Sequence, residues 1–225
     1  MKKGTQLVAY TNEELTLLIP ADETPIIRIM SLDELIHILF EKNIRFTRLD
    51  KFQDEFEGLA VVSKDSKEGD FTRKTSLISC WSYNINNPMW HLLNDNTEEV
   101  AIITTVGDFK RAIKSRVNRD FIIPFLMQYV PAGTLYELIN RSKLATRKID
   151  SYKHEKEIRF IYTKGVEKQP RKRLIKLDPT KMIKEIILSP EMSDENKRLI
   201  KNHLIRNEIY NIKVNGEYIK YDLNQ

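Results

Sequence analysis

Two glutamates and an arginine alternate with apolar residues in the segment EKEIRFIYT (155–163). In a strand, successive side chains point to opposite faces, so Glu155, Glu157 and Arg159 are predicted to share one face. A carboxylate on a rigid strand can bind a ribose hydroxyl, or stabilise oxocarbenium-like charge while a glycosidic bond breaks. The same alternation is also typical of a half-solvated strand, so a purely structural role stays open.

Three further polar residues precede this segment. Arg28 interrupts the short apolar run Ile26 to Ile29, where a charge is costly without a partner, and its guanidinium suits a diphosphate or a carboxylate. Ser79 and Ser82 lie on either side of Cys80-Trp81 in the predicted strand TSLISCWSY (75–83). Their hydroxyls could hold neighbouring strands together or bind a nucleotide.

This order resembles the arginine–serine–glutamate arrangement of ADP-ribosyltransferases. In that superfamily the arginine helps hold the NAD diphosphate, the serine motif braces the pocket, and the second glutamate promotes loss of nicotinamide. The resemblance implies that Arg28, then Ser79 or Ser82, then Glu157 take these places. Glu155 would occupy the substrate side. NAD is thereby predicted as a substrate, with a macromolecular acceptor, protein or nucleic acid.

A second resemblance covers about residues 26–214. The segments that carry it are RIMSLDELIHILFEKNIRFTRLDKFQDEFEG, ISCWSYNINNPMWHLLND, EVAIITT, KIDSYKHEKEIRFIY and LDPTKMIKEIILSPEM, in this order. They are similar to the motifs of the bacterial family catalogued as domain of unknown function 2971. The resemblance implies a soluble bacterial protein, often associated with mobile elements or phage defence, and it implies no established activity.

These motifs point to two pairs of candidate residues. Trp90 and Trp81 either pack in a core or form an aromatic wall against which nicotinamide or a base stacks. Lys148 and Arg159 either neutralise a phosphate beside Glu157 or pair with the glutamates.

The elements that must position these residues indicate an α+β fold. Strands are predicted at 26–29, 44–49, 75–83, 99–105, 121–130, 155–163, 173–177 and 182–188, and they outnumber the helices without alternating with them. We expect one compact domain, 1–225, with a mixed, mostly antiparallel, split sheet flanked by short helices, and an ADP-ribosyltransferase-like architecture is one form of it. Residues 1–25 form a lead-in segment, and 207–225 a hairpin.

Capping residues, apolar spacing and turn residues predict several helices and one turn. Ser31-Leu-Asp-Glu34 is a capping box before a helix whose apolar face is Leu32, Leu35, Ile36 and Leu39. Short helices are also predicted at 88–95 and 134–142, after Asp108, and at 193–206 with Leu199, Ile200, His203 and Leu204 inward. Asn215-Gly216 suits a type I′ hairpin turn, and Pro124 places its strand at an edge or a bulge.

Composition excludes several classes of protein. The chain has 225 residues, 41% of them hydrophobic and 31% charged, which excludes collagen-like and extensively disordered proteins. Its one cysteine, Cys80, excludes an intramolecular disulfide framework, and its four histidines form no zinc pattern, so we predict no metal site. Without a long apolar run or signal peptide, we expect a cytoplasmic protein that binds no membrane; the oligomeric state stays open.

Charge is distributed unevenly along the chain. Residues 101–176 hold 18 basic and 7 acidic residues, whereas residues 1–100 hold 11 basic and 17 acidic residues. The basic segment either faces phosphate or is an ordinary solvated surface.

Three functions remain open. The first is an NAD-using, ADP-ribosyltransferase-like toxin or phage-defence effector, with Glu157 and Glu155 as catalytic residues and Arg28, Ser79, Ser82, Trp90, Lys148 and Arg159 at the NAD. The second is a metal-dependent nuclease or other nucleic-acid processor with Asp54, Glu57, Glu155 and Glu157 on magnesium. The third is a non-catalytic binding or regulatory module of a defence or toxin–antitoxin system.

Overall fold

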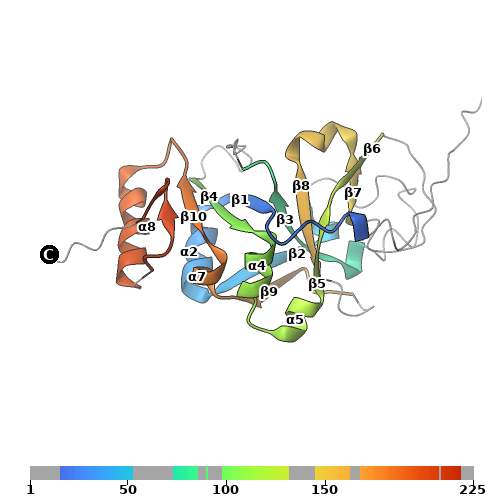
Figure 1. The fold of residues 1–225 in the computed structure, drawn as a ribbon, viewed down its shortest axis with the longest axis horizontal. Coiled ribbons are helices and arrows are strands. Elements are labelled where there is room, and N and C mark those ends of the chain that lie inside the picture. The colour runs from blue at the N-terminus through green and yellow to red at the C-terminus, as the bar shows by residue number, and fades with distance from the viewer. Residues whose placement is uncertain are drawn as a thin grey trace, which may run out of the picture. The chain divides into compact units, whose positions relative to one another are not determined.

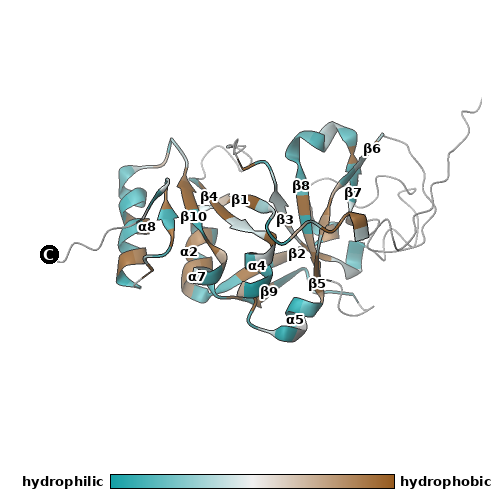
Figure 2. Ribbon diagram, viewed as in Figure 1, coloured by the Kyte–Doolittle hydropathy of each residue, from teal (hydrophilic) through white to brown (hydrophobic). Residues whose placement is uncertain are grey.

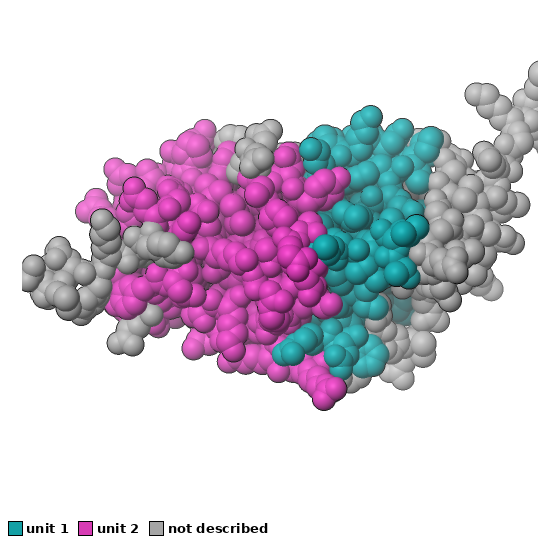
Figure 3. All heavy atoms as spheres, in the orientation of Figure 1, with its two compact units in different colours: residues 1–21, 45–81, 117–175 teal, residues 22–44, 82–116, 176–225 magenta. Residues whose placement is uncertain are grey.

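The computed structural model describes residues 16–52, 73–85, 90, 98–131, 145–162, 168–207 and 209–218. The chain forms two compact units (Figure 3), each assembled from three stretches of sequence. Unit 1 comprises Met1–Ala21, Arg45–Trp81 and Val117–Ile175, and unit 2 comprises Asp22–Ile44, Ser82–Arg116 and Lys176–Gln225.

Unit 2 is built around a mostly antiparallel sheet (Figure 1). Its strands are β1 (Pro25–Ser31), β4 (Glu99–Thr105), β10 (Glu185–Leu188), β11 (Lys213–Val214) and β12 (Glu217–Tyr218), in the order β12-β11-β10-β4-β1. The pairs β1–β4, β4–β10 and β11–β12 are antiparallel, and β10–β11 is parallel. Its helices are α2 (Leu32–Glu41), α4 (Val106–Ala112), α7 (Pro179–Met182) and α8 (Asp194–Arg206).

Helix and turn boundaries in unit 2 follow from local chemistry. The Ser31 hydroxyl accepts a hydrogen bond from the Glu34 N–H and so caps α2, as the capping box predicts. Asn215 and Gly216 both have positive φ, 49° and 85°, which confirms the type I′ turn of the hairpin. Figure 2 shows α8 as mostly hydrophilic, and only Ile200 and Leu204 are buried on it.

Unit 1 holds most of the other strands. They are β2 (Asn43–Arg48), β3 (Leu77–Ser82), β5 (Ile122–Leu126), β8 (Glu157–Tyr162) and β9 (Lys172–Lys176), paired in the order β5-β8-β3-β2-β9. A separate parallel pair consists of β6 (Gln128–Val130) and β7 (Arg147–Ile149). Short helical elements are η1 (Leu49–Lys51), α5 (Arg116–Asp120) and η2 (Asp150–Glu155). The end residues of β2, β3, α5 and β9 belong to unit 2.

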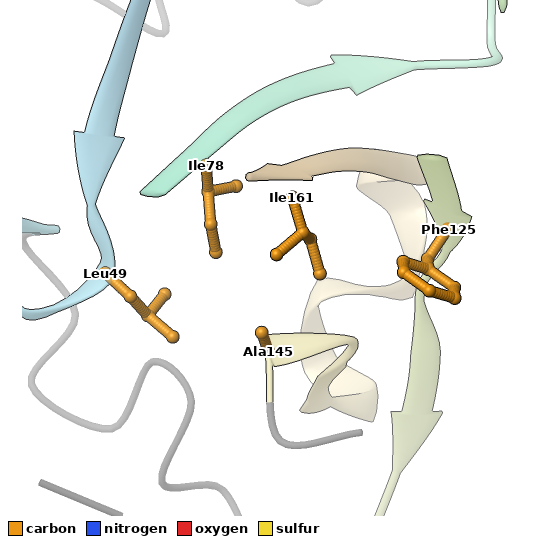
Figure 4. Packing of buried hydrophobic residues seen from close by; sticks show 5 residues of the cluster. All are labelled: Leu49, Ile78, Phe125, Ala145 and Ile161. Atoms are coloured by element: carbon orange, nitrogen blue, oxygen red, sulfur yellow. The ribbon is translucent and has the colours of Figure 1, made fainter. Parts of the chain in front are cut away.

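A small apolar cluster lies beside β8 in unit 1. Figure 4 shows its members, which come from five segments of the chain: Leu49, Ile78, Phe125, Ala145 and Ile161. Fully burying a side chain of this size contributes about 1.5–3 kcal/mol, so the cluster fixes β8 against its neighbours. Pro124 lies in β5, which among the described strands pairs with β8 alone, as expected for a residue without an N–H.

The α+β class and the mostly antiparallel sheet are confirmed. Three local predictions are wrong. Thr105 rather than Asp108 caps α4, because its hydroxyl accepts the Asp108 N–H. Leu199 of α8 is 47% exposed, and on α2 Ile38 is buried where Ile36 was predicted. The predicted helices at 88–95 and 134–142 lie outside the described residues, apart from Trp90. No helix in the described part of the chain combines the length and apolarity needed to cross a membrane.

Candidate functional site

The predicted Glu-x-Glu segment lies where η2 leads into β8, at the top of Figure 1. Glu155 ends η2 instead of lying on the strand, which corrects the prediction that both glutamates project from one strand. The cause is Lys156, whose left-handed backbone (φ 46°) turns the chain before β8 begins at Glu157. All six residues of β8 are buried, so the strand has no solvated face.

Glu157 and Arg159 form a buried ion pair along β8. The Nε of Arg159 donates to Oε1 of Glu157 at 2.8 Å, and Nη2 donates to Oε2 at 3.2 Å. The remaining guanidinium nitrogen, Nη1, donates to the Ala145 carbonyl at 3.0 Å. The side chains of Arg159 and Glu157 are 0% and 5% exposed. This bidentate geometry fixes both oxygens of the carboxylate.

Lys148 of β7 connects the two glutamates. Its Nζ lies 2.6 Å from Oε2 of Glu155 and 3.4 Å from Oε2 of Glu157. The same ammonium lies 4.7 Å from the centre of the Tyr152 ring, a cation–π distance. Lys148 and Glu155 retain 12% and 24% of their side-chain exposure, so they form the part of the network that solvent reaches.

The surroundings shift the pKa values of these groups. Burial raises the pKa of the Glu157 carboxyl, while the charge of Lys148 and the Cys80 thiol act to lower it. Burial acts to lower the pKa of Lys148, but Glu157 and Glu155 outweigh it and raise that pKa. The low dielectric of the buried site therefore strengthens the interaction between each pair of charges in the network. The protonation of each group depends on the charges of its neighbours.

Two residues near Glu157 were missed in the sequence. The Glu157 N–H donates to the hydroxyl of Tyr129 at 2.8 Å, and burial raises the pKa of this phenol. Cys80 of β3 reaches the Glu157 carboxyl with its thiol. Tyr129 comes close because β5 runs antiparallel to β8 and the Met127 N–H, two residues before Tyr129, donates to the Glu157 carbonyl at 3.0 Å, and no local spacing reveals a pairing of that kind.

Ser79, a further candidate residue in unit 1, makes a contact that is structural. Ser79 is buried, and its hydroxyl accepts a hydrogen bond from the indole Nε1 of Trp81 at 3.1 Å. Trp81 is itself buried and meets Phe160 edge-on, with ring centres 6.2 Å apart. These contacts support the core-packing alternative for Trp81. Trp90 is half-buried, and its sequence neighbours lie outside the described residues.

Arg28 and Ser82 belong to unit 2. An Nη2 of Arg28 donates to Oε1 of Glu34 at 2.6 Å, so a carboxylate partners this guanidinium. The Ser82 hydroxyl accepts the Asn84 N–H at 3.1 Å. Within unit 1, therefore, the structure brings together Lys148, Glu155, Glu157 and Arg159. That Arg28 and Ser82 join them around one NAD molecule stays a prediction.

The magnesium hypothesis depends largely on residues outside the described part. Asp54 and Glu57 both lie there. Within the described part, no group of three or more histidine, cysteine, aspartate or glutamate side chains could hold a metal ion.

Comparisons with known proteins place these observations beside solved structures. No family model matches the sequence, and no curated protein matches it. The chain is similar to Thermus sp. 2.9 DarT in complex with ADP-ribosylated ssDNA, at 14% identity and a TM-score of 0.43, over 86% of this chain and 94% of that one. It is also similar to the same protein in complex with carba-NAD+ and with NAD+. Each of these shows 13% identity and a TM-score of 0.42 over 87% of this chain, and they cover 96% and 97% of the DarT chains.

An ADP-ribosyltransferase activity of this chain stays a prediction. Membership of the family of unknown function also stays a prediction. A fixed carboxylate in a low dielectric can stabilise a developing positive charge, and the partly exposed Lys148 and Glu155 can meet a polar substrate.

Proposed function

We propose that this protein is an ADP-ribosyltransferase-like enzyme that uses NAD as a substrate and modifies a macromolecule. The observation that carries the proposal is the buried Glu157 carboxylate, held by Arg159 at 2.8 Å and next to the partly exposed Lys148 and Glu155. A buried ion pair adds little net stability compared with apolar residues of similar volume. Groups of this kind, with shifted pKa values, are common at functional sites.

In the proposed reaction the bond between C1′ of the ribose and the nicotinamide nitrogen breaks, and its electron pair leaves with nicotinamide. The carboxylate of Glu157 stabilises the positive charge that develops on the ribose. A lone pair of the acceptor then forms the new bond to C1′. Glu155, 24% exposed, orients the acceptor and receives its proton, while Lys148 neutralises phosphate. Arg159 is a positioning residue that orients the Glu157 carboxylate through two hydrogen bonds.

The test is nicotinamide release from NAD by the purified full chain. Glu157→Gln keeps the size of the side chain and removes its charge, so we expect release to fall at least about 100-fold. Glu99→Gln is the matched control, because Glu99 is also a buried glutamate but belongs to β4 of unit 2. Full turnover by Glu157→Gln would refute the role of Glu157. Absence of NAD binding to wild type by calorimetry would refute the proposal.

Glu155→Gln separates the two glutamates. If Glu155 acts on the acceptor, this variant still hydrolyses NAD but transfers little ADP-ribose to a macromolecule. Equal loss of hydrolysis and transfer would contradict the division of roles. The role of toxin or phage-defence effector follows from the family resemblance alone. It predicts that expression of wild type arrests bacterial growth and that expression of Glu157→Gln does not.

A second candidate is a non-catalytic binding or regulatory module. The observation in its favour is that two cations, Lys148 and Arg159, pair with two anions, Glu155 and Glu157. A network balanced in this way can serve to fix the structure of unit 1. This candidate predicts that wild type neither binds nor cleaves NAD and that Glu157→Gln lowers Tm.

A further inference from the structure

A second group of charged residues in unit 1 is linked to Gln169 and to its neighbour Asp50. Its members come from three segments of the chain: Arg48 and Lys51, Arg73 and Lys74, and Arg171 and Arg173. The Gln169 carbonyl accepts a hydrogen bond from Nη1 of Arg48 at 2.6 Å, and its side-chain oxygen accepts one from Nη2 of Arg173 at 3.4 Å. The Gln169 N–H donates to the Lys74 carbonyl at 2.9 Å, and the Arg171 carbonyl accepts the Arg48 N–H. These six basic residues are called the Gln169 cluster below.

The described residues contribute one carboxylate to the Gln169 cluster. Asp50 receives Nε and Nη2 of Arg48 at 2.6 and 2.9 Å, and Nζ of Lys51 lies 3.7 Å away. Burial acts to raise the pKa of Asp50, but Arg48, Lys51 and Arg73 hold it below its usual value. Within the described part of the chain, the cluster therefore holds more cations than carboxylates.

Two arginines carry that excess charge. The Nε atoms of Arg73 and Arg173 are buried and have no hydrogen-bond partner among the described residues. Arg173 lies against the Tyr162 ring, 4.8 Å from its centre, and donates to the Tyr162 hydroxyl at 3.1 Å. A tyrosine thus holds the guanidinium plane in place without neutralising it. A guanidinium held in this way is suited to the oxygens of a phosphate.

Exposed charges extend the cluster along the chain. The segment Lys168-Gln-Pro-Arg171-Lys172-Arg173 places four basic residues within six positions, and Lys168, Arg171 and Lys172 are exposed. By sequence, unit 1 holds 22 basic and 15 acidic residues, whereas unit 2 holds 15 and 17. A series of exposed cations around held arginines fits a polymer of phosphates better than a single anion.

We propose that the Gln169 cluster binds the phosphate backbone of a nucleic acid. Its contact with Tyr162 lies at the opposite end of β8 from Glu157, about 16 Å away at about 3.3 Å per residue. The cluster is therefore a separate site from the glutamates. The inference goes beyond the proposed function and does not depend on cleavage of NAD.

The experiment is fluorescence anisotropy with a labelled single-stranded DNA oligonucleotide at several salt concentrations. The double variant Arg73→Gln/Arg173→Gln removes two guanidinium groups of the cluster, of which Tyr162 holds that of Arg173. We expect its affinity to fall at least tenfold and the slope of log K against log salt to become shallower by about 1.4, since each phosphate contact on a single strand contributes about 0.7. The double variant Arg171→Gln/Lys172→Gln tests the exposed rim of the cluster, which these two residues form. Because both side chains are exposed, we expect the fold to be unchanged.

The matched control is Lys201→Gln/Arg206→Gln. It removes the same charge from two exposed residues of α8 in unit 2, and we expect affinity and slope to stay near those of wild type. An equal loss of affinity in the control and cluster variants would overturn the proposal, because net charge alone would then explain binding. Rim variants that bind like wild type would also overturn it.

Competition separates the possible sources of phosphate. Inorganic phosphate should displace the oligonucleotide only at concentrations where salt of equal ionic strength does the same. Binding of inorganic phosphate alone, with no oligonucleotide binding, would overturn the assignment to nucleic acid.

Residues 53–72, which join Phe52 to Arg73 in the sequence, contain six acidic and two basic residues, so the chain itself also supplies negative charge. If wild type binds no oligonucleotide and the arginine variants only lower Tm, the cluster has a structural role and the proposal is wrong.

Discussion

In unit 1 the carboxylate of Glu157 and the guanidinium of Arg159 are almost wholly buried, whereas in unit 2 the ion pairs of Asp108 face solvent. Asp108 lies in the first turn of α4 and meets Arg111 and Lys184, each at 2.6 Å, and these two cations are 61% and 55% exposed. An exposed pair contributes about 0–1 kcal/mol. A buried pair demands desolvation of both charges, and breaking it is costly.

This difference shows which charges the fold itself explains. Asp108 follows the Thr105 cap and accepts its hydroxyl, so it belongs to the local design of a helix start. Glu157 and Arg159 cap no helix, and apolar residues of similar size would fill their place in β8 of unit 1. A functional role is the simplest reason for their presence, and the stability of variants can test that reasoning.

The largest effect is expected for Arg159→Met. Methionine fills similar space but leaves the Glu157 carboxylate buried without its main partner, so the free energy of unfolding should fall by about 3–5 kcal/mol. Urea denaturation followed by circular dichroism measures it. A loss no greater than that for Asp108→Asn would remove the contrast between the two units.

The matching double variant is Glu157→Leu/Arg159→Met. Because it removes both charges together, it should regain most of the stability lost in Arg159→Met. It should nevertheless show no release of nicotinamide from NAD. A double variant as unstable as the single one would mean that the pair is needed for the fold, which favours the non-catalytic alternative.

A smaller effect is expected where local chemistry sets the structure of unit 2. Ser31→Ala removes the hydroxyl that accepts the Glu34 N–H at the start of α2, and should cost about 1 kcal/mol. Thermal unfolding measures this change as a lower Tm. Asn202→Ala, an exposed position on α8, is the control and should leave stability unchanged or slightly higher. No loss in Ser31→Ala would show that tertiary contacts alone determine this helix.

Features decided within a few residues were predictable from the sequence. The cap at Ser31, the strand 99–105 and the turn at Asn215-Gly216 depend on neighbouring side chains and backbone preferences, and each agrees with the structure. The same kind of reasoning identified Arg159 and Glu157 as neighbours on one side of a strand, because side chains two residues apart share a face.

Features decided by distant pairing were not predictable. Glu155 leaves the strand because Lys156 adopts a left-handed conformation, which is uncommon for residues other than glycine. Burial of β8 on both faces involves packing against segments distant in the sequence, as Ile161 shows with Leu49 and Phe125, so its polar alternation was misleading. Tyr129 reaches the Glu157 N–H through the antiparallel pairing of β5 with β8, two segments that are about 30 residues apart in the sequence.

The smallest effects, and the sharpest contrast, concern pH. Arg111, Lys184 and Thr105 outweigh burial and lower the pKa of Asp108 from 3.8 to about 2. Between these values the unfolded chain binds more protons, so the stabilisation is present above pH 3.8 and is lost as pH falls toward 2. Asp108→Asn should therefore cost about 1 kcal/mol or less at pH 6, and the difference from wild type should vanish near pH 2.

The raised pKa of Glu157 gives the opposite sign. Above its ordinary value of 4.5 the folded chain holds the proton more tightly, so the contribution of Glu157 to stability falls as pH rises. Urea denaturation of wild type, Asp108→Asn and Glu157→Gln between pH 2 and 7 compares the two. As pH rises, the free energy of unfolding of wild type should increase relative to that of Asp108→Asn and decrease relative to that of Glu157→Gln. If the stability of wild type instead increased with pH relative to both variants, the charges of Arg159 and Lys148 would outweigh the burial of Glu157. The pKa of Glu157 would then be lowered, as that of Asp108 is.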